Sequence, residues 1–415
     1  MNKYKLGDIS EIQSGPFGTQ LHKDEYVLEG IPMLNSKNIG NGIVVEDSLD
    51  FVPEAVCERL PRYVLKKGDI LFGRAGTIER HTYVDSKYDG CFQGTNCIRI
   101  RCKDKQKSRY ISYYLWLNKL KVKIENAAGG SIQSYITTDL LKDIEVEIPD
   151  DYEKRANFLS LIDEKIHNNN QINDNLEQQI LSIYHYLFTQ FDFPDEVGKP
   201  YCSSGGKMLQ NDILKRNIPI TWKVKTLGEL CSFQNGINYD KGIIGDKDYR
   251  IINVRNISSS SILLDENELD IISLPHKKGD KYCVTDDSII IARSGIPGAT
   301  RILFKPTTNT IFCGFIICCT PTDKELQYYL TFYLKLLEGS SATQTGGSIL
   351  QNVSQDTLSS LPVPIPPKML LDEFNQTVLQ TFELIHTNMN ETSQLINLRD
   401  WLLPMLMNGQ ATISD

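Results

Sequence analysis

The chain has 415 residues, 40% of them hydrophobic and 23% charged, which is enough for two or three globular domains with sizeable cores. Its formal net charge of −8 at pH 7 does not favour a nucleic-acid partner, although the distribution of charge matters more than its sum. No apolar run is long enough to span a membrane and no apolar signal region follows Met1, so we expect a cytoplasmic protein.

The first third of the chain is predicted to form short strands and loops punctuated by glycine, proline and asparagine. A strand over 31–39 ends in turn-forming residues, and a buried strand near 70–72 is followed by Arg74, which stands between small residues. A helix is expected near 109–124. A last strand alternates between apolar and charged residues and ends at Pro149.

Residues 99–123 form a basic stretch, with nine lysines and arginines against the lone acid Asp104. Three tyrosines and a tryptophan are interleaved with them. One interpretation is a solvated strand and loop followed by a helix whose aromatic side chains face the core. The other is an edge that faces phosphate groups. The sequence favours the core for the aromatic side chains and leaves both interpretations of the basic side chains open.

A long helix is predicted over 152–188, because its apolar residues and asparagines recur three and four positions apart. This narrow pattern is typical of a coiled-coil seam, and a buried asparagine in such a seam restricts register and partner number. A second helical stretch over 371–407 supplies a partner, and it repeats Ile166-His167-Asn168-Asn169 as Ile385-His386-Thr387-Asn388 about 219 residues later. The predicted seam consists of Leu159, Ile162, Ile166, Asn169, Asn173, Leu176, Ile180, Ile183 and Leu187.

The order of signals begins again after the first long helix. Residues 194–206 carry glycine, proline and serine without periodicity, as in a surface connection. Five segments of the first half then recur in the same order, at offsets of 217 to 221 residues. The chain is therefore a duplication of one globular domain followed by one long helix. The paired segments are 6–15 and 227–236, 33–39 and 251–257, 68–76 and 287–295, 129–132 and 346–349, and 144–149 and 361–366.

We predict an α+β fold in which two similar mixed α/β domains alternate with two long helices. The helices pair as an antiparallel coiled coil, which gives the molecule approximate two-fold symmetry. The first domain spans 1–150 and the second spans 221–367. The central helix covers 151–192, a linker covers 193–220, and the C-terminal helix covers 368–410. Because the two domains differ in most surface residues, we expect them to recognise different targets.

No set of catalytic residues is found in the sequence. It lacks the phosphate-binding Gly-x-x-x-x-Gly-Lys-[Ser/Thr], the zinc motif His-Glu-x-x-His, and the Asn-Pro-Pro-Tyr tetrad of base methylases. The ten cysteines contain no Cys-x-x-Cys pair, so a metal or redox framework is unsupported. A nuclease-like pattern of Asp150 with Asp163-Glu164-Lys165 falls on a helix, where its side chains diverge. We expect no catalysis by the chain alone, no cofactor of its own and no metal site.

Two kinds of paired loop remain as candidate binding sites. Arg74 and Arg293 each follow a buried strand and stand between small residues, where a backbone can approach a ligand closely. Arginine suits bidentate contact with guanine or phosphate, and the alternative is a surface ion pair. The Gly-Gly-Ser-Ile loops at 129–132 and 346–349 offer backbone N–H groups to a phosphate, or they are plain helix entries.

These residues together resemble the specificity subunit of type I restriction–modification enzymes, over essentially the whole chain. The resemblance departs at the helix entries, where the Pro-Pro-x-x-Glu-Gln of that family is degraded to residues 149–154 and 366–369. It rests on Leu6-Gly7-Asp8, Gly68-Asp69-Ile70-Leu71, Arg74-Ala75-Gly76-Thr77-Ile78, Gly129-Gly130-Ser131, Ile148-Pro149 and their second-half counterparts.

The resemblance implies a DNA-reading protein that is not catalytic by itself. Each target recognition domain would bind one half of an asymmetric, interrupted target in double-stranded DNA, and the helices would fix the gap. The helices would also dock modification subunits, expected to be two, which use S-adenosylmethionine to methylate adenine at N6. Restriction subunits would use ATP and magnesium to translocate and cut foreign DNA. The net acidity implies that DNA binding depends partly on these partners.

The DNA-contact candidates are the polar and basic residues of the paired strand ends and loops. They are Asn35, Lys37, Arg74, Arg80, Ser131, Gln133, Ser134, Asn253, Arg255, Arg293, Arg301, Ser348, Gln351 and Asn352. The candidates for docking a partner subunit are Phe158, Tyr184 and Phe188, and the alternative is that these three pack on the chain's own domains.

A competing class is a non-catalytic coiled-coil scaffold whose globular heads bind proteins, which the duplication, the seam and the acidity also fit. A shift of duplex DNA by the assembled complex that depends on salt and on sequence would separate the two classes. A stand-alone nuclease or methylase is disfavoured by the missing motifs.

Overall fold

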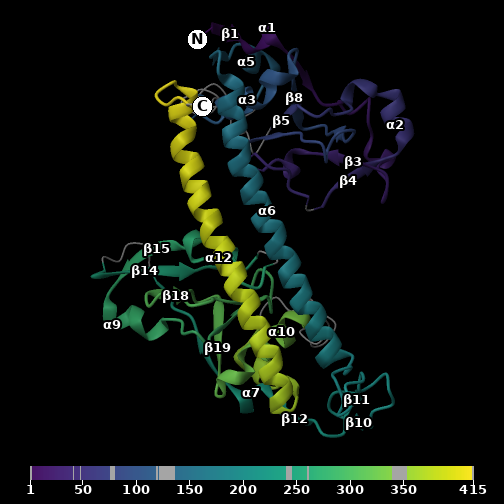
Figure 1. Cartoon of the computed structure of the whole chain (residues 1–415), viewed down its shortest axis with the longest axis vertical. Helices are drawn as coiled ribbons and strands as arrows, with labels where there is room; N and C mark the ends of the chain where they lie inside the picture. The colour runs from purple at the N-terminus through teal and green to yellow at the C-terminus, as the bar shows by residue number, and fades with distance from the viewer. Residues whose placement is uncertain are drawn as a thin grey trace. The chain divides into compact units, whose positions relative to one another are not determined.

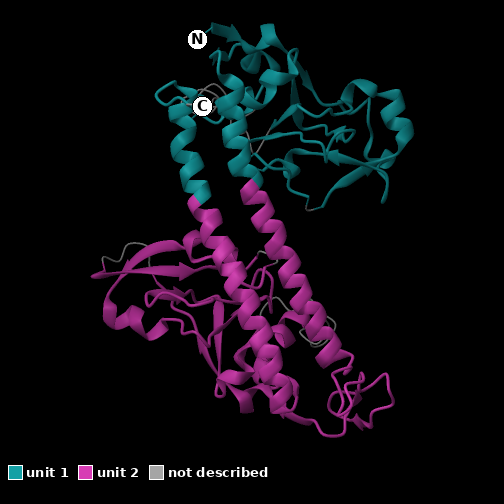
Figure 2. Ribbon diagram, in the orientation of Figure 1, with its two compact units in different colours: residues 1–164, 395–415 teal, residues 165–394 magenta. Residues whose placement is uncertain are grey.

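The computed structural model describes residues 2–40, 42–46, 48–74, 80–117, 120, 136–239, 245–258, 261–338 and 353–413. The chain divides into two compact units, residues 1–164 with 395–415 and residues 165–394 (Figure 2). Each long helix is shared between the units, so the units do not follow the predicted domain limits. Each unit is described by itself below.

Unit 1 begins with a globular domain, residues 2–148, that precedes the first long helix (Figure 1). We call this domain, and its counterpart in unit 2, a head. Its elements are β1 (Asn2–Lys5), α1 (Leu6–Ile9), β2 (Ser10–Ser14), β3 (Ile31–Leu34), β4 (Asp50–Val52), α2 (Glu54–Arg59), β5 (Ile70–Gly73), β6 (His81–Tyr83), β7 (Phe92–Gln93), β8 (Cys97–Cys102), α3 (Lys105–Leu115), α5 (Thr138–Lys142) and β9 (Glu145–Ile148). The helix expected near 109–124 is α3, which starts earlier because Asp104 caps it by accepting a hydrogen bond from the N–H of Gln106 (3.1 Å).

The strands of unit 1 form three small sheets. One has four strands in the order β2-β8-β5-β6, one has three in the order β4-β3-β7, and β1 pairs with β9. The last pairing joins residues 2–5 to residues 145–148, so the head closes on itself where its two ends meet. The main core lies between the four-stranded sheet and α3, and Tyr110 of α3 donates to the carbonyl of Glu147 (3.0 Å).

Unit 2 repeats this plan after a connecting segment. Its elements are β10 (Met208–Asn211), β11 (Arg216–Pro219), β12 (Lys223–Thr226), α7 (Leu227–Leu230), β13 (Cys231–Asn235), β14 (Lys247–Ile252), α8 (Val254–Ile257), β15 (Asp270–Leu274), α9 (His276–Gly279), β16 (Ile289–Ala292), β17 (Thr300–Ile302), β18 (Thr310–Phe312), β19 (Ile316–Pro321), α10 (Gln327–Leu336), α11 (Gln355–Ser359) and β20 (Pro362–Ile365).

Three sheets of unit 2 match the three sheets of unit 1 strand for strand. Their orders are β13-β19-β16-β17, β15-β14-β18 and β12-β20, so two similar mixed α/β heads are present, as predicted. Small contacts repeat as well. Thr137 caps α5 by accepting from the N–H of Leu140, and Ser354 caps α11 by accepting from the N–H of Thr357. A duplicated sequence has therefore kept its local hydrogen bonds as well as its strand order.

The linker over 193–220 is more ordered than its composition indicates. β10 and β11 form an antiparallel hairpin within it, in which Met208 pairs with Pro219. The ring of Phe193 stacks on Tyr201 at 4.8 Å and on Trp222 at 5.8 Å between ring centroids. Scattered aromatic residues without periodicity gave no sign of this packing.

The long helices are α6 (Tyr152–Tyr184), which continues as a π-helical turn over His185–Thr189, and α12 (Lys368–Met407). A proline stands between the last strand and the long helix in each half, at Pro149 and Pro366, and it lacks the N–H that would extend the strand pairing. Both helices pass from one unit into the other (Figure 2). Within the described ranges, no helix is long and apolar enough to cross a membrane.

Candidate nucleic-acid interface

Several strand ends of unit 1 meet at one edge of its head. The antiparallel register sets Ser14 against Ile98 and Gly73 against Cys97, so the loops that follow β2 and β5 start beside the loop that precedes β8. β3 ends at the same level, because its last residue accepts a hydrogen bond from the N–H of Gly94 (2.9 Å). We call this edge rim 1, made of residues 15–18, 35–38, 74, 94–96 and 136.

The main chain of Arg74 is fixed on both sides within rim 1. Its N–H donates to the carbonyl of Asn96 (2.9 Å), and its own carbonyl accepts from the N–H of Ile136 (3.1 Å). Ile136 follows the segment that holds the first Gly-Gly-Ser-Ile loop, which lies outside the described residues. The chain therefore leaves that segment beside Arg74, which links the two predicted loops.

The side chain of Arg74 lies against an exposed aromatic ring. Its guanidinium carbon is 5.2 Å from the ring centroid of Phe17, a cation–π distance. Phe17 is 53% exposed although phenylalanine is among the residues most often buried. Rim 1 thus presents a cation and an apolar ring side by side.

Two more candidate DNA contacts, Asn35 and Lys37, both bind the carboxylate of Asp50. Its Oδ2 accepts from Nδ2 of Asn35 (2.8 Å) and lies 3.0 Å from Nζ of Lys37. The N–H of Asn35 also donates to Oδ1 of Asn38 (3.1 Å), which fixes the turn. The charge of Lys37 is therefore balanced by Asp50 of the same head. The ion pair is partly exposed, so it adds little stability.

Unit 2 builds the same edge from the equivalent strands. The register sets Asn235 against Ile317 and Ala292 against Ile316, and the N–H of Cys313 donates to the carbonyl of Ile252 (3.0 Å). We call this edge rim 2, made of residues 236–239, 253–257, 293–298, 313–315 and 353.

Arg293 is anchored in rim 2 as Arg74 is in rim 1. Its N–H donates to the carbonyl of Phe315 (2.9 Å), and its carbonyl accepts from the N–H of Val353 (2.9 Å). The side chain differs, because Nη1 of Arg293 donates to the carbonyl of Gly314 (3.2 Å). The exposed apolar side chains here are Phe315, 62% exposed, and Ile296, 45% exposed.

The cluster around Asp50 also has a counterpart, at Asp270. Oδ2 of Asp270 accepts from Nδ2 of Asn253 (3.2 Å), and Oδ1 pairs with the guanidinium of Arg255. Asn253 is held by Asn256 through a 2.9 Å hydrogen bond from its N–H. Six of the predicted contact residues, three from each half, are therefore brought together at equivalent edges.

The remaining candidates have different outcomes. Arg80 is exposed and directly precedes β6, whose pairing with β5 places it at the level of rim 1. Arg301 is 2% exposed, and its Nη1 donates to Oε1 of Glu338 (2.6 Å). The prediction that Arg301 contacts DNA is therefore wrong, because its guanidinium is buried and already paired with Glu338, 37 residues further along the chain. Ser131, Gln133, Ser134, Ser348, Gln351 and Asn352 lie outside the described residues.

Part of the basic stretch is internal. Arg99 is completely buried and donates to Oε1 of Glu11 (2.8 Å), and Arg101 donates to both carboxylate oxygens of Asp69 (2.8 and 2.7 Å). Burial lowers the pKa of Arg99, whereas the hydrogen bond to Asp69 raises the pKa of Arg101. The interleaved tyrosines of α3, Tyr110, Tyr113 and Tyr114, are buried, which confirms the core interpretation for these three residues, whereas Trp116 is half-buried.

Two of the three docking candidates are buried in unit 2. Tyr184 and Phe188 are each 2% exposed, and their rings lie 5.8 and 5.0 Å from Phe374 of α12. The prediction that they face a partner subunit is therefore wrong. Phe158 is 38% exposed, and Leu161, one turn further along α6, is 64% exposed.

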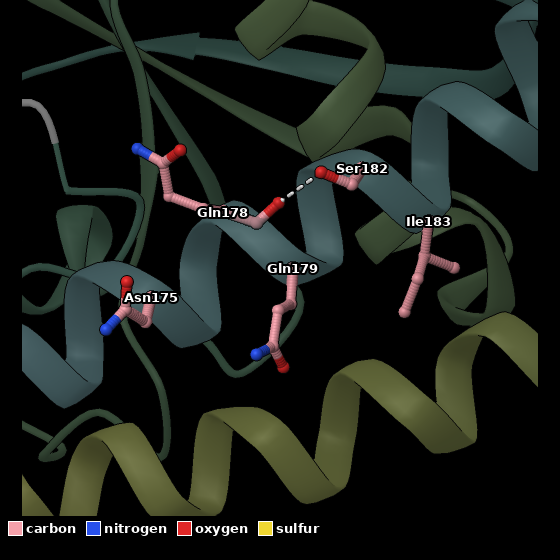
Figure 3. Close-up of a pocket in the computed structure, with 5 residues that line it drawn as sticks. All are labelled: Asn175, Gln178, Gln179, Ser182 and Ile183. Carbon is pink, nitrogen blue, oxygen red and sulfur yellow. Dashed lines mark hydrogen bonds between the residues drawn. The ribbon is translucent and has the colours of Figure 1, made fainter.

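The seam shifts by one residue near the end of α6. Ile180 is 1% exposed, but the predicted seam residue Ile183 is 37% exposed and Tyr184 takes the inner position. An α-helix drifts against a strict heptad, and the π-helical turn over His185–Thr189 widens the next turn. Ile183 instead lines an open hollow of about 540 Å³ with Asn175, Gln178, Gln179 and Ser182 (Figure 3).

The two seam asparagines both have polar partners on α12 within unit 2. Asn169 is 1% exposed and donates from Nδ2 to Oε2 of Glu391 (2.8 Å) and to Oγ1 of Thr392 (3.4 Å). Oδ1 of Asn173 accepts from Nδ2 of Asn388 (2.9 Å). In unit 1, Asp163 of α6 accepts from Nη1 of Arg399 (3.0 Å) and from the hydroxyl of Tyr113 in α3 (2.5 Å).

The fold and the two rims define a duplicated protein with one loop rim on each α/β head. The sequence model of the type I restriction modification DNA specificity domain matches residues 1–178 and 219–397, which are the two halves. The chain belongs to that family.

Two relatives and one solved structure resemble the chain over nearly its whole length. The type I restriction enzyme MjaIX specificity subunit of Methanocaldococcus jannaschii is 24% identical, covering 99% of this chain and 93% of its own length. The HindI specificity subunit of Haemophilus influenzae is 22% identical, covering 98% and 99%. The type I specificity subunit from M. genitalium aligns with a TM-score of 0.57 at 17% identity, covering 100% of this chain and 96% of the other, which shows a shared fold.

Proposed function

We propose that this chain reads a bipartite DNA target for a type I restriction–modification complex, with one head for each half of the target. The observation that carries the proposal is the pair of rims. They are built alike in backbone but carry exposed aromatic rings in different loops, Phe17 in the loop after β2 of rim 1 and Phe315 in the loop before β19 of rim 2. Equivalent scaffolds with different exposed residues suit two different half-sites on one kind of ligand.

The helices act as the spacer in this proposal, paired antiparallel with approximate two-fold symmetry. Two contacts support it: Asn169 with Thr392, and Asn173 with Asn388. Asn388 is the repeat counterpart of Asn169, and Thr392 that of Asn173, at the same offset. Exchanging the two halves of the repeat therefore turns one contact into the other. Such an exchange is typical of a self-complementary, two-fold interface.

Catalysis belongs to partner subunits under this proposal, and the chain holds no cofactor. Modification subunits supply S-adenosylmethionine and transfer a methyl group to adenine N6, and restriction subunits supply ATP hydrolysis and magnesium. The polar rims position DNA, and the helices hold the partners.

The assembled complex should bind duplex DNA in a way that depends on both sequence and salt. The measurement is fluorescence anisotropy of labelled duplexes carrying the methylated motif, compared with scrambled duplexes, between about 50 and 200 mM salt. We expect at least about 10³-fold discrimination and a linear fall of log K with log salt concentration. Equal binding of motif and scrambled duplexes, or none, would favour the scaffold that binds proteins.

Phe158 is the remaining candidate for docking a modification subunit. Replacing it with Glu should abolish copurification of that subunit, because a charge in an apolar interface is desolvated without a partner. Because Phe158 is 38% exposed, the change also removes a partly buried ring, and the chain should lose about 1–2 kcal/mol while remaining folded. Tyr184→Ala is the contrasting variant, expected to cost about 3–5 kcal/mol because Tyr184 is buried. Intact copurification of Phe158→Glu would remove this face from the interface.

A further inference from the structure

Each rim has one arginine that forms no ion pair within the described part of the chain. Lys37 and Arg255 are paired with Asp50 and Asp270. Arg74 and Arg293 make no ion pair with any residue that the structure describes. Their contacts are a ring face for Arg74 and a backbone carbonyl for Arg293.

The main chains of the two arginines are also held in the same way in the two rims. The N–H of Arg74 donates to the carbonyl of Asn96, in the loop before β8. The N–H of Arg293 donates to the carbonyl of Phe315, in the loop before β19. The carbonyl accepts from the N–H of Ile136 or Val353, the first described residue after the segment that holds the Gly-Gly-Ser-Ile motif. The Cα atoms are thus held alike although the loops around them differ in sequence.

DNA offers a repeated feature that fits a repeated cation. The sugar–phosphate backbone is chemically the same at both half-sites, whereas the base edges differ between the halves of an asymmetric target. A residue held identically in both heads therefore suits the part of the ligand that is identical. Residues that differ between the heads suit the part that differs.

The exposed apolar side chains are what differs. In rim 1 the apolar residue is Phe17, in the loop after β2. In rim 2 they are Phe315, in the loop before β19, and Ile296, in the loop after β16. The Arg74 guanidinium covers one face of the Phe17 ring, so the ring is not free to insert between two base pairs, which requires both faces. Its edge and other face remain for the thymine methyl group, the apolar feature of the major groove.

We infer that Arg74 and Arg293 are sequence-independent phosphate contacts, one in each head, and that Phe17 reads a thymine methyl group in the half-site of the first head. Phe315, which lies in a different loop, reads a base in the half-site of the second head. The inference rests on the proposed function and assigns separate tasks to neighbouring residues of each rim.

Arginine variants of the full complex test the phosphate assignment. Arg74→Gln should weaken binding by a similar factor for motif and scrambled duplexes, and lower the magnitude of the salt slope by about 1. Arg74→Lys should keep most of the affinity and the slope, because a phosphate accepts a point charge whereas a bidentate contact to guanine does not. The same two changes at Arg293 should behave alike.

A duplex in which each thymine in turn is replaced by deoxyuridine tests the reading by Phe17. At one position of the first half-site, loss of the methyl group should weaken the unmodified complex about fourfold, the effect of one buried methyl-sized group. Phe17→Ala should weaken binding to the full motif and become insensitive to that deoxyuridine. Its salt slope should stay unchanged.

Three results would overturn the inference while leaving DNA reading intact. The first is an Arg74→Lys variant that loses discrimination at one base pair, which would make Arg74 a base reader. The second is an Arg74→Gln variant with an unchanged salt slope. The third is a Phe17→Ala variant that keeps the full sensitivity to deoxyuridine. If the unmodified complex itself fails to discriminate the motif from scrambled DNA, the proposed function fails instead.

Discussion

Exchange of residues 1–150 for the equivalent head of a relative with a different known target should replace one half of the methylated motif and leave the other half and the gap unchanged. The physical reason is closure of the head. β1 pairs with β9 over residues 2–5 and 145–148, so both ends of the exchanged segment lie at one strand pair beside the start of α6. The effect is complete at one half-site, since every rim 1 residue is replaced.

The matched control is the reciprocal exchange of residues 221–367. That head closes in the same way, through β12 and β20 over residues 223–226 and 362–365. It should alter only the other half of the motif. The readout is the set of methylated sequences made by each chimera with its partner subunits. If exchange of either head altered both halves, the assignment of one head to one half-site would be wrong.

Four residues inserted into each long helix should lengthen the gap of the target by one or two base pairs and leave both half-sites unchanged. The insertion points are after Gln171 in α6 and after Asn390 in α12, which correspond in the repeat. Four residues add about 6 Å and close to one full turn, so the flanking contacts of Asn169 and Asn173 keep their faces. Base pairs are about 3.4 Å apart.

Insertion of two residues at the same points is the control. It rotates the following part of each helix by about half a turn, which turns the seam outward, so assembly with the partner subunits should be lost. The measurement is copurification followed by sequencing of the methylated motif. An active four-residue variant whose gap is unchanged would show that these helices do not set the spacing.

The sequence was sufficient for the parts of the fold that depend on order and period. Repeated segments in the same order, at offsets of 217 to 221 residues, predicted two like heads, and the strand orders of the two units agree with that. Strand ends marked by Asn35 and Asn253, and by Arg74 and Arg293, predicted the loops that form the rims. These signals are local, because turn residues and buried strands leave their pattern in a few adjacent positions.

Features that depend on packing partners far along the chain were missed. Arg301 looks like an exposed cation in sequence, and only the fold shows that Glu338 lies beside it. Tyr184 and Phe188 follow the heptad on its outer side, and only the aromatic residues of α10 and the start of α12 reveal an inner face there. The hairpin of β10 and β11 has no alternating pattern strong enough to predict it.

Sequencing of adenine methylation in the host genome, with and without the gene for this chain, tests the central claim most directly. The account predicts one asymmetric bipartite motif, two defined halves separated by a fixed gap, that is methylated in the parent and unmethylated after deletion. Restoring the gene should restore the same motif. Deletion that leaves every methylated motif in place, or that removes an uninterrupted palindrome instead, would contradict the account.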